Sequence, residues 1–226
     1  MILELLHAAA RGTFPPEDGE TEVVGAAAGA RAAVLSFTAH HVVAADVPPD
    51  EVLAAVDPTN LNGPVAPSVL AWLAERTGLR AGSLDVVLAW VPPALAPPHD
   101  GAVREISPSD HPRIVRARRW RRDLRVFAGE DGLVVLGRGL ADRLELSMEV
   151  APERRGQGRA RELVVAALAA AAPTEPVFAQ VAAANAASLR ALQPAGFVAV
   201  GAEVLFGPHG DFLRRSGGTV AVAPSA

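Results

Sequence analysis

The chain has 226 residues, half of them hydrophobic, so it can bury a substantial core in one large domain or two small ones. It contains no cysteine, which excludes disulfide frameworks and thiolate chemistry and favours a reducing, cytoplasmic setting. The formal net charge of -4 argues against general nucleic-acid binding. No apolar run reaches the ~20 residues that span a bilayer, and a basic leader is lacking, so we expect a soluble protein with no membrane partner.

Residues 1–91 predict a small α/β domain of unknown role. Apolar side chains recur at helical spacing in some segments and alternate in others. The expected elements are a short amphipathic helix over 2–10, β structure over 32–47, helices over 49–56 and 67–77, and a buried strand over 83–91. His40 and His41 are adjacent, so on a strand they point to opposite faces and do not readily hold one metal. The sequence therefore predicts no metal site.

Residues 92–101, "PPALAPPHDG", contain four prolines and a glycine and are predicted to link this part to a second domain over 102–207. Tight turns such as "GEDG" join closely spaced apolar runs, which is typical of antiparallel hairpins. The expected order is a strand (103–106), a helix (110–120), three strands (124–129, 133–140, 143–150), a helix (159–172), a strand (176–182), a helix from 185 and a last strand (196–206). The tail over 208–226 is predicted to be loose.

Seven arginines surround one tryptophan in residues 113–125, "RIVRARRWRRDLR". One interpretation is a patch for an acidic partner or a phosphate. The other is a solvated helix face, with Ile114, Val115 and Trp120 turned inward. The acidic net charge of the chain favours the second interpretation.

A glycine loop, "VAPERRGQGRAR", joins the apolar strand that ends at Val150 to the alanine-rich helix that follows. A helix amino terminus has unpaired N–H groups and a partial positive charge, so it attracts phosphate where no side chain blocks the approach. Gly156 and Gly158 remove that block, and neighbouring arginines add a positive field. The loop lacks the lysine of the P-loop and the three-glycine dinucleotide spacing, which argues against nucleotide hydrolysis and NAD binding. An ordinary strand-to-helix turn is the alternative.

Two motifs in this part of the chain resemble those of the GNAT superfamily of acetyl-CoA-dependent N-acetyltransferases. In the first, an aliphatic residue is followed at fixed spacings by Gln or Arg, Gly, and Gly or Ala, here Val150, Arg155, Gly158 and Ala160. In the second, "NAASLRALQPAGF", an asparagine, Asn185, opens a helix that ends in a Gly-Phe pair. The resemblance covers residues 103–206. It implies an α/β (α+β) fold with a mixed, mostly antiparallel central sheet flanked by helices.

The resemblance also implies a donor, acetyl-CoA, and residues that would hold it. In the family a central strand splays from its neighbour and the pantetheine arm lies in the gap. The implied cofactor-binding residues are Met148 and Val150 for the pantetheine, Arg155, Gly156, Gln157, Gly158, Arg159 and Ala160 for the pyrophosphate, and Asn185 for the pantetheine or acyl end. No metal is implied.

Family members generally use direct attack of an amine on the thioester, which suits a chain without cysteine. Catalysis then needs positioning, a base and polarisation of the carbonyl. Glu145 and Glu149 are candidate bases if burial raises the pKa of either carboxyl, and exposed strand glutamates are the alternative. The family often places a tyrosine acid where this chain has Leu192, and the chain has no tyrosine. Ser188 is the candidate hydroxyl substitute, or it simply bonds the backbone.

The function implied is transfer of an acetyl group to a primary amine, on a small molecule or a protein. The missing tyrosine keeps a second interpretation open, a CoA-sensing or interaction module without turnover. Residues 1–91 are expected to cover the acceptor side or to mediate pairing as a homodimer. The acceptor itself has no signature in the sequence.

Overall fold

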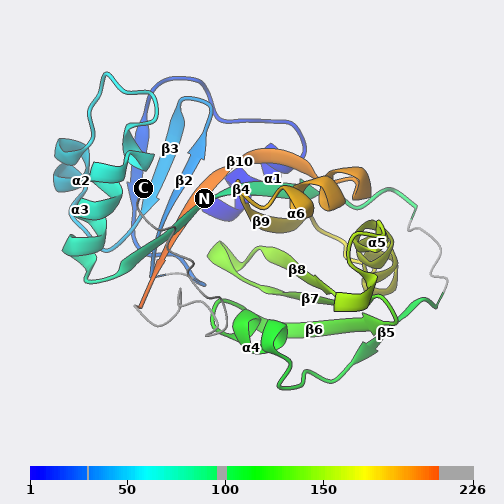
Figure 1. Cartoon of the computed structure of the whole chain (residues 1–226). Coiled ribbons are helices and arrows are strands. Elements are labelled where there is room, and N and C mark those ends of the chain that lie inside the picture. The colour runs from blue at the N-terminus through cyan, green and yellow to red at the C-terminus, as the bar shows by residue number, and fades with distance from the viewer. Residues whose placement is uncertain (30, 96–100, 209–226) are drawn as a thin grey trace, which may run out of the picture.

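The computed structural model describes residues 1–29, 31–95 and 101–208, which share one ten-stranded sheet in the order β1-β3-β2-β10-β4-β9-β8-β7-β6-β5 (Figure 1). The strands are β1 (Thr21–Val24), β2 (Ala32–Phe37), β3 (His40–Ala44), β4 (Arg80–Trp90), β5 (Val103–Ile106), β6 (Arg122–Gly129), β7 (Gly132–Arg138), β8 (Leu144–Val150), β9 (Val177–Ala182) and β10 (Val198–Gly207). The expected fold class, mixed α/β with a mostly antiparallel sheet flanked by helices, is confirmed. Residues 96–100 of the expected linker and 209–226 of the expected tail lie outside the described residues.

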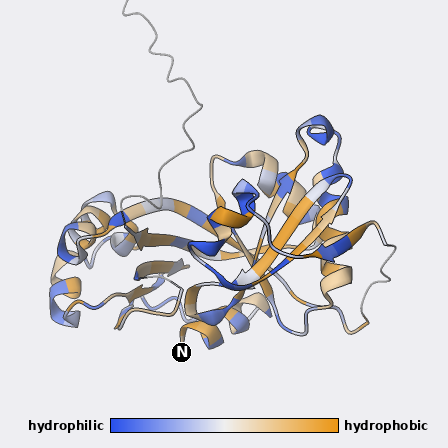
Figure 2. Ribbon diagram, turned by 90° about the horizontal axis from the view of Figure 1, so that it is seen from below, coloured by the Kyte–Doolittle hydropathy of each residue, from blue (hydrophilic) through white to orange (hydrophobic). Residues whose placement is uncertain are grey.

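Helices cover both faces of this sheet. They are α1 (Ile2–Ala10), α2 (Pro49–Ala55), α3 (Pro67–Thr77), α4 (Pro112–Arg118), α5 (Arg159–Ala171) and α6 (Ala186–Leu192). Successive strand residues point to opposite faces; on β7, Val135 packs in the cluster with α4, whereas Val134 and Leu136 pack in the cluster with α5. In Figure 2 hydrophobic residues concentrate on the strands, while the helices carry both colours. The core is therefore a layer on each side of the sheet.

Strand β4 precedes the proline-rich segment in the chain and yet lies between β9 and β10. It pairs antiparallel with β10 along its length and with β9 from Asp85 to Trp90. The sheet thus runs without interruption across the boundary that the sequence suggested at 92–101. The division of the chain into separately folding domains stays a prediction.

Strands β8 and β9 form the feature that positions the site. They run parallel and pair only at Leu144 with Val177 and at Glu145 with Phe178. Both strands continue beyond these pairs, to Val150 and Ala182 respectively. The two strands therefore diverge after their first residues and leave backbone groups of β8 and β9 without a partner strand.

Most elements form where the side-chain pattern predicts them, and two details differ. Strand β1 was missed because its four residues are only half-buried and show no alternation. The expected helix over 110–120 is shorter, and the prediction that Val115 turns inward is wrong, since it is 38% exposed. Ile114 and Ala117, three residues apart, form the buried stripe of this seven-residue helix, so Val115 lies off it.

Candidate functional site

A cleft of about 1010 Å³ lies where the end of β8, the glycine loop, α5 and α6 meet. Residues from both sequence motifs line it. Of the residues named from the sequence, those in the lining are Met148, Glu149, Val150, Arg155, Gly156, Gly158, Arg159, Ala160, Asn185 and Ser188. Gln157 and Glu145 are not in the lining. The fold thus gathers two segments that are about thirty residues apart in the chain around one space.

The glycine loop owes its shape to two left-handed residues. Gly156 has φ 75° and Gly158 has φ 78°, a backbone region that side chains rarely adopt. A Cβ added at either glycine would meet nothing within 4 Å, so conformation, not space, requires glycine. Gly158 is the N-cap of α5, and no side chain caps this helix. The first N–H groups of α5 are therefore left for solvent or a ligand.

Four arginines surround this loop, each with a partner in the protein. Arg155 Nε donates to the carbonyl oxygen of Val150 at 3.1 Å, and Arg161 Nε donates to that of Pro194 at 3.1 Å. Arg159 pairs with Glu162 at 2.6 Å, and Arg154 pairs with Glu130. The field at the loop is positive but partly neutralised. The side chain of Gln157 turns back to the carbonyl of Glu153 at 2.9 Å, which keeps it out of the cleft.

Asn185 and Ser188 lie on the far wall of the cleft. Asn185 Oδ1 accepts the backbone N–H of Ser188 at 3.1 Å, so Asn185 is the N-cap of α6. Among the described residues the amide nitrogen of Asn185 has no hydrogen-bond partner, and Asn185 lines the cleft. Leu192 is buried at 3% exposure in the core beside α5, so no hydroxyl reaches the cleft from that position. Pro194 lies in a 3-10 turn that ends at Gly196, whose φ is 96°.

Two carboxylates line the cleft, Glu149 and Glu162, and Glu162 is paired with Arg159. Glu149 is the one on β8. Its side chain is 27% exposed, with Arg113 Nε 3.5 Å from Oε2 and an Arg155 guanidinium nitrogen 3.7 Å from Oε1. These are loose ion pairs that leave the carboxylate oxygens open to a ligand or a water.

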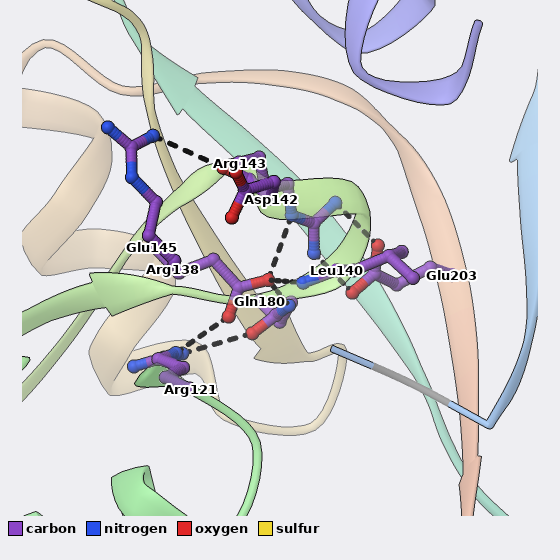
Figure 3. A network of polar contacts seen from close by, with 8 residues as sticks. All are labelled: Arg121, Arg138, Leu140, Asp142, Arg143, Glu145, Gln180 and Glu203. Atoms are coloured by element: carbon purple, nitrogen blue, oxygen red, sulfur yellow. Dashed lines mark hydrogen bonds and ion pairs between the residues drawn. The ribbon is translucent and has the colours of Figure 1, made fainter. Parts of the chain in front are cut away.

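Glu145 does not reach the cleft, because it is buried in a polar network on the sheet face that carries α1 and α4 (Figure 3). Its oxygens accept from Arg121 at 2.6 Å, Arg143 at 2.9 Å, Gln180 at 2.7 Å and the backbone of Leu140 at 3.2 Å. Burial alone would raise the pKa of Glu145, but Arg143 and Arg121 outweigh it and hold the pKa of this carboxyl below its ordinary value. The condition under which Glu145 would serve as a base is therefore not met.

The same network extends to β10 through Arg143. This arginine has no exposed side-chain surface and makes a two-pronged contact with Glu203 at 2.6 and 2.8 Å. Burial opposes its charge, but Glu203 and Glu145 together raise the pKa of Arg143. Its guanidinium also lies 5.4 Å above the ring of Phe178. The network ties β8, β9 and β10 together at the point where β8 and β9 begin to diverge.

Sequence reasoning missed a second, smaller pocket between α4 and strands β4, β8, β9 and β10. Its residues include Asp85, Ser147 and Gln180, together with arginines of the 113–125 segment. The only signal for it was the polar residue Asp85 in a strand that otherwise reads as buried. No spacing in the sequence connects Asp85 to β8, because the two meet only through the sheet.

Comparison with known proteins gives loose structural similarity alone. No family model and no curated protein matches the chain. Among solved structures, a GNAT-family acetyltransferase, described as putative, from Novosphingobium aromaticivorans aligns with TM-score 0.43 and 20% identity, over 58% of this chain and 68% of that one. A GCN5-related N-acetyltransferase from Kribbella flavida aligns with TM-score 0.40 and 14% identity, over 62% and 63%. A functionally unknown protein from Staphylococcus epidermidis aligns with TM-score 0.40 and 17% identity, over 63% and 67%.

The alignments thus span about two thirds of the neighbours' lengths, and at such scores no functional conclusion is drawn from them. Within the described ranges, no helix is both long and apolar enough to cross a membrane. The same residues hold no group of three or more histidines and carboxylates arranged for a metal ion.

Proposed function

We propose that the cleft binds acetyl-CoA and that the chain transfers the acetyl group to a primary amine by direct attack. The observation that carries this proposal is the meeting of both motif segments at one cleft, with two left-handed glycines leading into the uncapped helix α5.

The loop suits a diphosphate for electrostatic reasons. Alternating left- and right-handed residues turn successive N–H groups to one side, which makes an anion-binding concavity. The N-terminus of α5, a thirteen-residue helix, adds its partial positive charge at the same point. Gly156 and Gly158 present no side chain there, so an anion can approach the backbone closely.

The divergence of β8 from β9 suits the pantetheine arm. The amide groups of the arm would pair with backbone groups of β8 beyond Glu145, where β9 no longer pairs with β8. The carbonyl of Val150 already accepts from Arg155, so this proposal places the arm's contacts nearer Met148 unless Arg155 turns away.

The chemistry then rests on positioning. The amine nitrogen attacks the thioester carbon, the C–N bond forms and the C–S bond breaks, and the CoA thiolate takes up a proton. The sequence suggested three residues that could assist proton transfer, and two of them, Glu149 and Ser188, line the cleft. A water can protonate the thiolate in place of the missing tyrosine, because a thiol of pKa near 8.5 is a tolerable leaving group.

Calorimetric titration with acetyl-CoA tests the proposal. Replacing Gly158 with valine forces a β-branched residue to φ 78°, so we expect the loop to distort and affinity to fall about tenfold or more. The matched control is Gly78→Val, because Gly78 has φ 65°, ends α3 away from the cleft and also has open space around it. The control should bind normally. Absence of heat with the unchanged protein would refute the proposal.

A second candidate function is a CoA-binding module without turnover. The observation that favours it is the apolar, buried Leu192 where a proton-donating hydroxyl would be expected, in a chain without tyrosine. Thiol release measured over a panel of amines separates the two functions, since binding with no release supports the module.

A further inference from the structure

The pocket on the α4 side of the sheet has a volume of about 170 Å³ and is lined mostly by polar groups. At ~30 Å³ for each water in the liquid, this equals the volume of roughly six waters, the size of a small head group. Its lining residues are Gly82, Ser83, Asp85, Arg113, Arg116, Ala117, Trp120, Arg121, Ser147, Gln180 and Leu205. Asp85 is the single carboxylate among them.

This pocket adjoins the cleft at the divergence of β8 and β9. Ser147 and Gln180 lie beyond the last paired residues of the two strands and belong to the pocket. Met148, the next residue of β8, belongs to the cleft, and Arg113 lines both spaces. A thioester held along β8 would therefore end beside the pocket.

The carboxylate of Asp85 can accept more hydrogen bonds than the structure gives it. It is half-buried, and the structure gives it one hydrogen bond, from Ser83 Oγ to Oδ1 at 2.6 Å. Burial raises the pKa of this carboxyl, and the Ser83 hydrogen bond and the charge of Arg116 offset the rise only in part. A carboxylate whose pKa is raised is a better proton acceptor near neutral pH.

Two further groups at the pocket lack partners among the described residues. Ser147 Oγ is buried and makes no hydrogen bond. The guanidinium of Arg116, an exposed residue of α4 that lines the pocket, has neither a hydrogen bond nor an ion pair, although its charge acts on Asp85. Arg121, in contrast, is committed to Glu145 and Gln180. A buried polar group without a partner, such as Ser147 Oγ, is costly in a fold and is common where a ligand binds. The guanidinium of Arg116 is exposed to water and is free to pair with an anion.

We propose that this pocket holds the acceptor amine, that Asp85 is the catalytic proton acceptor, and that Arg116 selects amines carrying a carboxylate, such as a small amino acid. This inference rests on the proposed function. It adds a catalytic residue from β4, outside the part of the chain that carries the motifs, and names the substrate class.

The proton balance is simple. An acceptor arrives as an ammonium ion and gives one proton to the Asp85 carboxylate, directly or through water. The free amine then forms the C–N bond as the C–S bond breaks. The second proton leaves the nitrogen through solvent to the CoA thiolate, and Asp85 returns its own proton to solvent. The products are the N-acetyl compound and free CoA.

Charge explains the selectivity. The lining carries three arginines and one carboxylate, so a second positive charge on the acceptor, as in a polyamine, is repelled. An acceptor carboxylate can instead take the free guanidinium of Arg116 in a two-pronged contact. The ammonium group then lies toward Asp85 and Ser147.

Several groups around Asp85 bear on its pH dependence. They are Ser83 on β4, Glu203 opposite it on β10, which Arg143 neutralises, Gln180 on β9, Arg113 and Arg116 on α4, and Arg121 after α4. The unneutralised charges among them are positive, so burial is the cause of the raised pKa.

Steady-state thiol release tests the inference with small amino acids, their amides and diamines as acceptors. Arg116→Gln should raise KM for the amino acids about tenfold or more and leave the amides unaffected. Arg118→Gln is the matched control, since Arg118 is on the same helix, is exposed and does not line the pocket. Equal rates with amides or diamines and amino acids in the unchanged protein would overturn the selectivity.

Asp85→Asn tests the proton acceptor. We expect kcat to fall about 10²–10⁴-fold and the bend set by Asp85 in the acid limb of kcat/KM to disappear, with acetyl-CoA affinity unchanged by calorimetry. Because burial disfavours the charged form of Asp85, replacing it with the neutral asparagine should not lower Tm. Undiminished turnover in this variant overturns the inference and leaves the transferase proposal standing, whereas failure of the unchanged protein to bind acetyl-CoA removes both.

Discussion

At the scale of single residues, Glu145 shows how a side chain that looks catalytic in the sequence can be structural. It alternates with apolar residues on β8, the strand that leads to the cleft, and this pattern made it a candidate base. Two guanidiniums, Gln180 and a backbone amide occupy its oxygens. Arg143 and Leu140 are near it in the sequence, but Arg121 and Gln180 are 24 and 35 residues away, so no local pattern could reveal the whole network.

Removing the Glu145 carboxylate should destabilise the fold. Glu145→Ala leaves Arg121 without a carboxylate partner in a buried site and leaves Arg143 with Glu203 alone, so we expect a loss of about 3–5 kcal/mol in the free energy of unfolding. The surface pair of Glu51 with Arg76 offers a control, because Glu51→Ala should change stability far less. Urea denaturation measures both. Equal small effects would contradict the role assigned to the network.

The same residue predicts a pH dependence. In the unfolded chain a glutamate ionises near 4.3, and in the fold the pKa of Glu145 is lower. Its contribution to stability is therefore complete above the unfolded pKa and is lost as the pH falls through the folded value. Glu145→Gln should show a smaller loss of stability than the unchanged protein between neutral pH and pH values below about 4.

At the scale of elements, the sequence predicted the arrangement of the cleft better than its chemistry. Glycines at fixed spacing after an apolar strand predict a loop that leads into a helix, and Gly156, Gly158 and α5 have this form. The asparagine of the second motif opens α6 as expected. The position of Asp85 in the pocket beside the cleft could not be predicted from the sequence, because β4 and β9 become neighbours only in the assembled sheet.

Asn185 has two roles that substitution can separate. Asn185→Ala removes the cap of α6 and should cost about 1 kcal/mol of stability. Asn185→Ser keeps a capping oxygen but loses the side-chain amide nitrogen of a residue that lines the cleft. We expect the serine variant to retain stability and to bind acetyl-CoA more weakly, as measured by thermal melting and calorimetry. Unchanged acetyl-CoA binding in the serine variant would show that Asn185 only caps α6 and does not contact the ligand.

At the scale of the whole molecule, one sheet places strands from both ends of the described chain side by side. β10 pairs with β2 on one edge and β4 on the other, so the first ninety residues complete the sheet that holds the cleft (Figure 1). The sequence predicted the elements on each side of the proline-rich segment, but pairing between distant strands leaves no local trace. This arrangement brings Asp85 to the α4-side pocket.

The central claim is that the backbone amides at the head of α5 bind the diphosphate of coenzyme A, and a crystal structure with acetyl-CoA tests it most directly. We predict diphosphate oxygens within about 2.7–3.2 Å of N–H groups between Arg155 and Ala160, with the acetyl group beside Ser147. A ligand-free loop in crystals saturated with acetyl-CoA, or a ligand bound elsewhere on the protein, would contradict the claim.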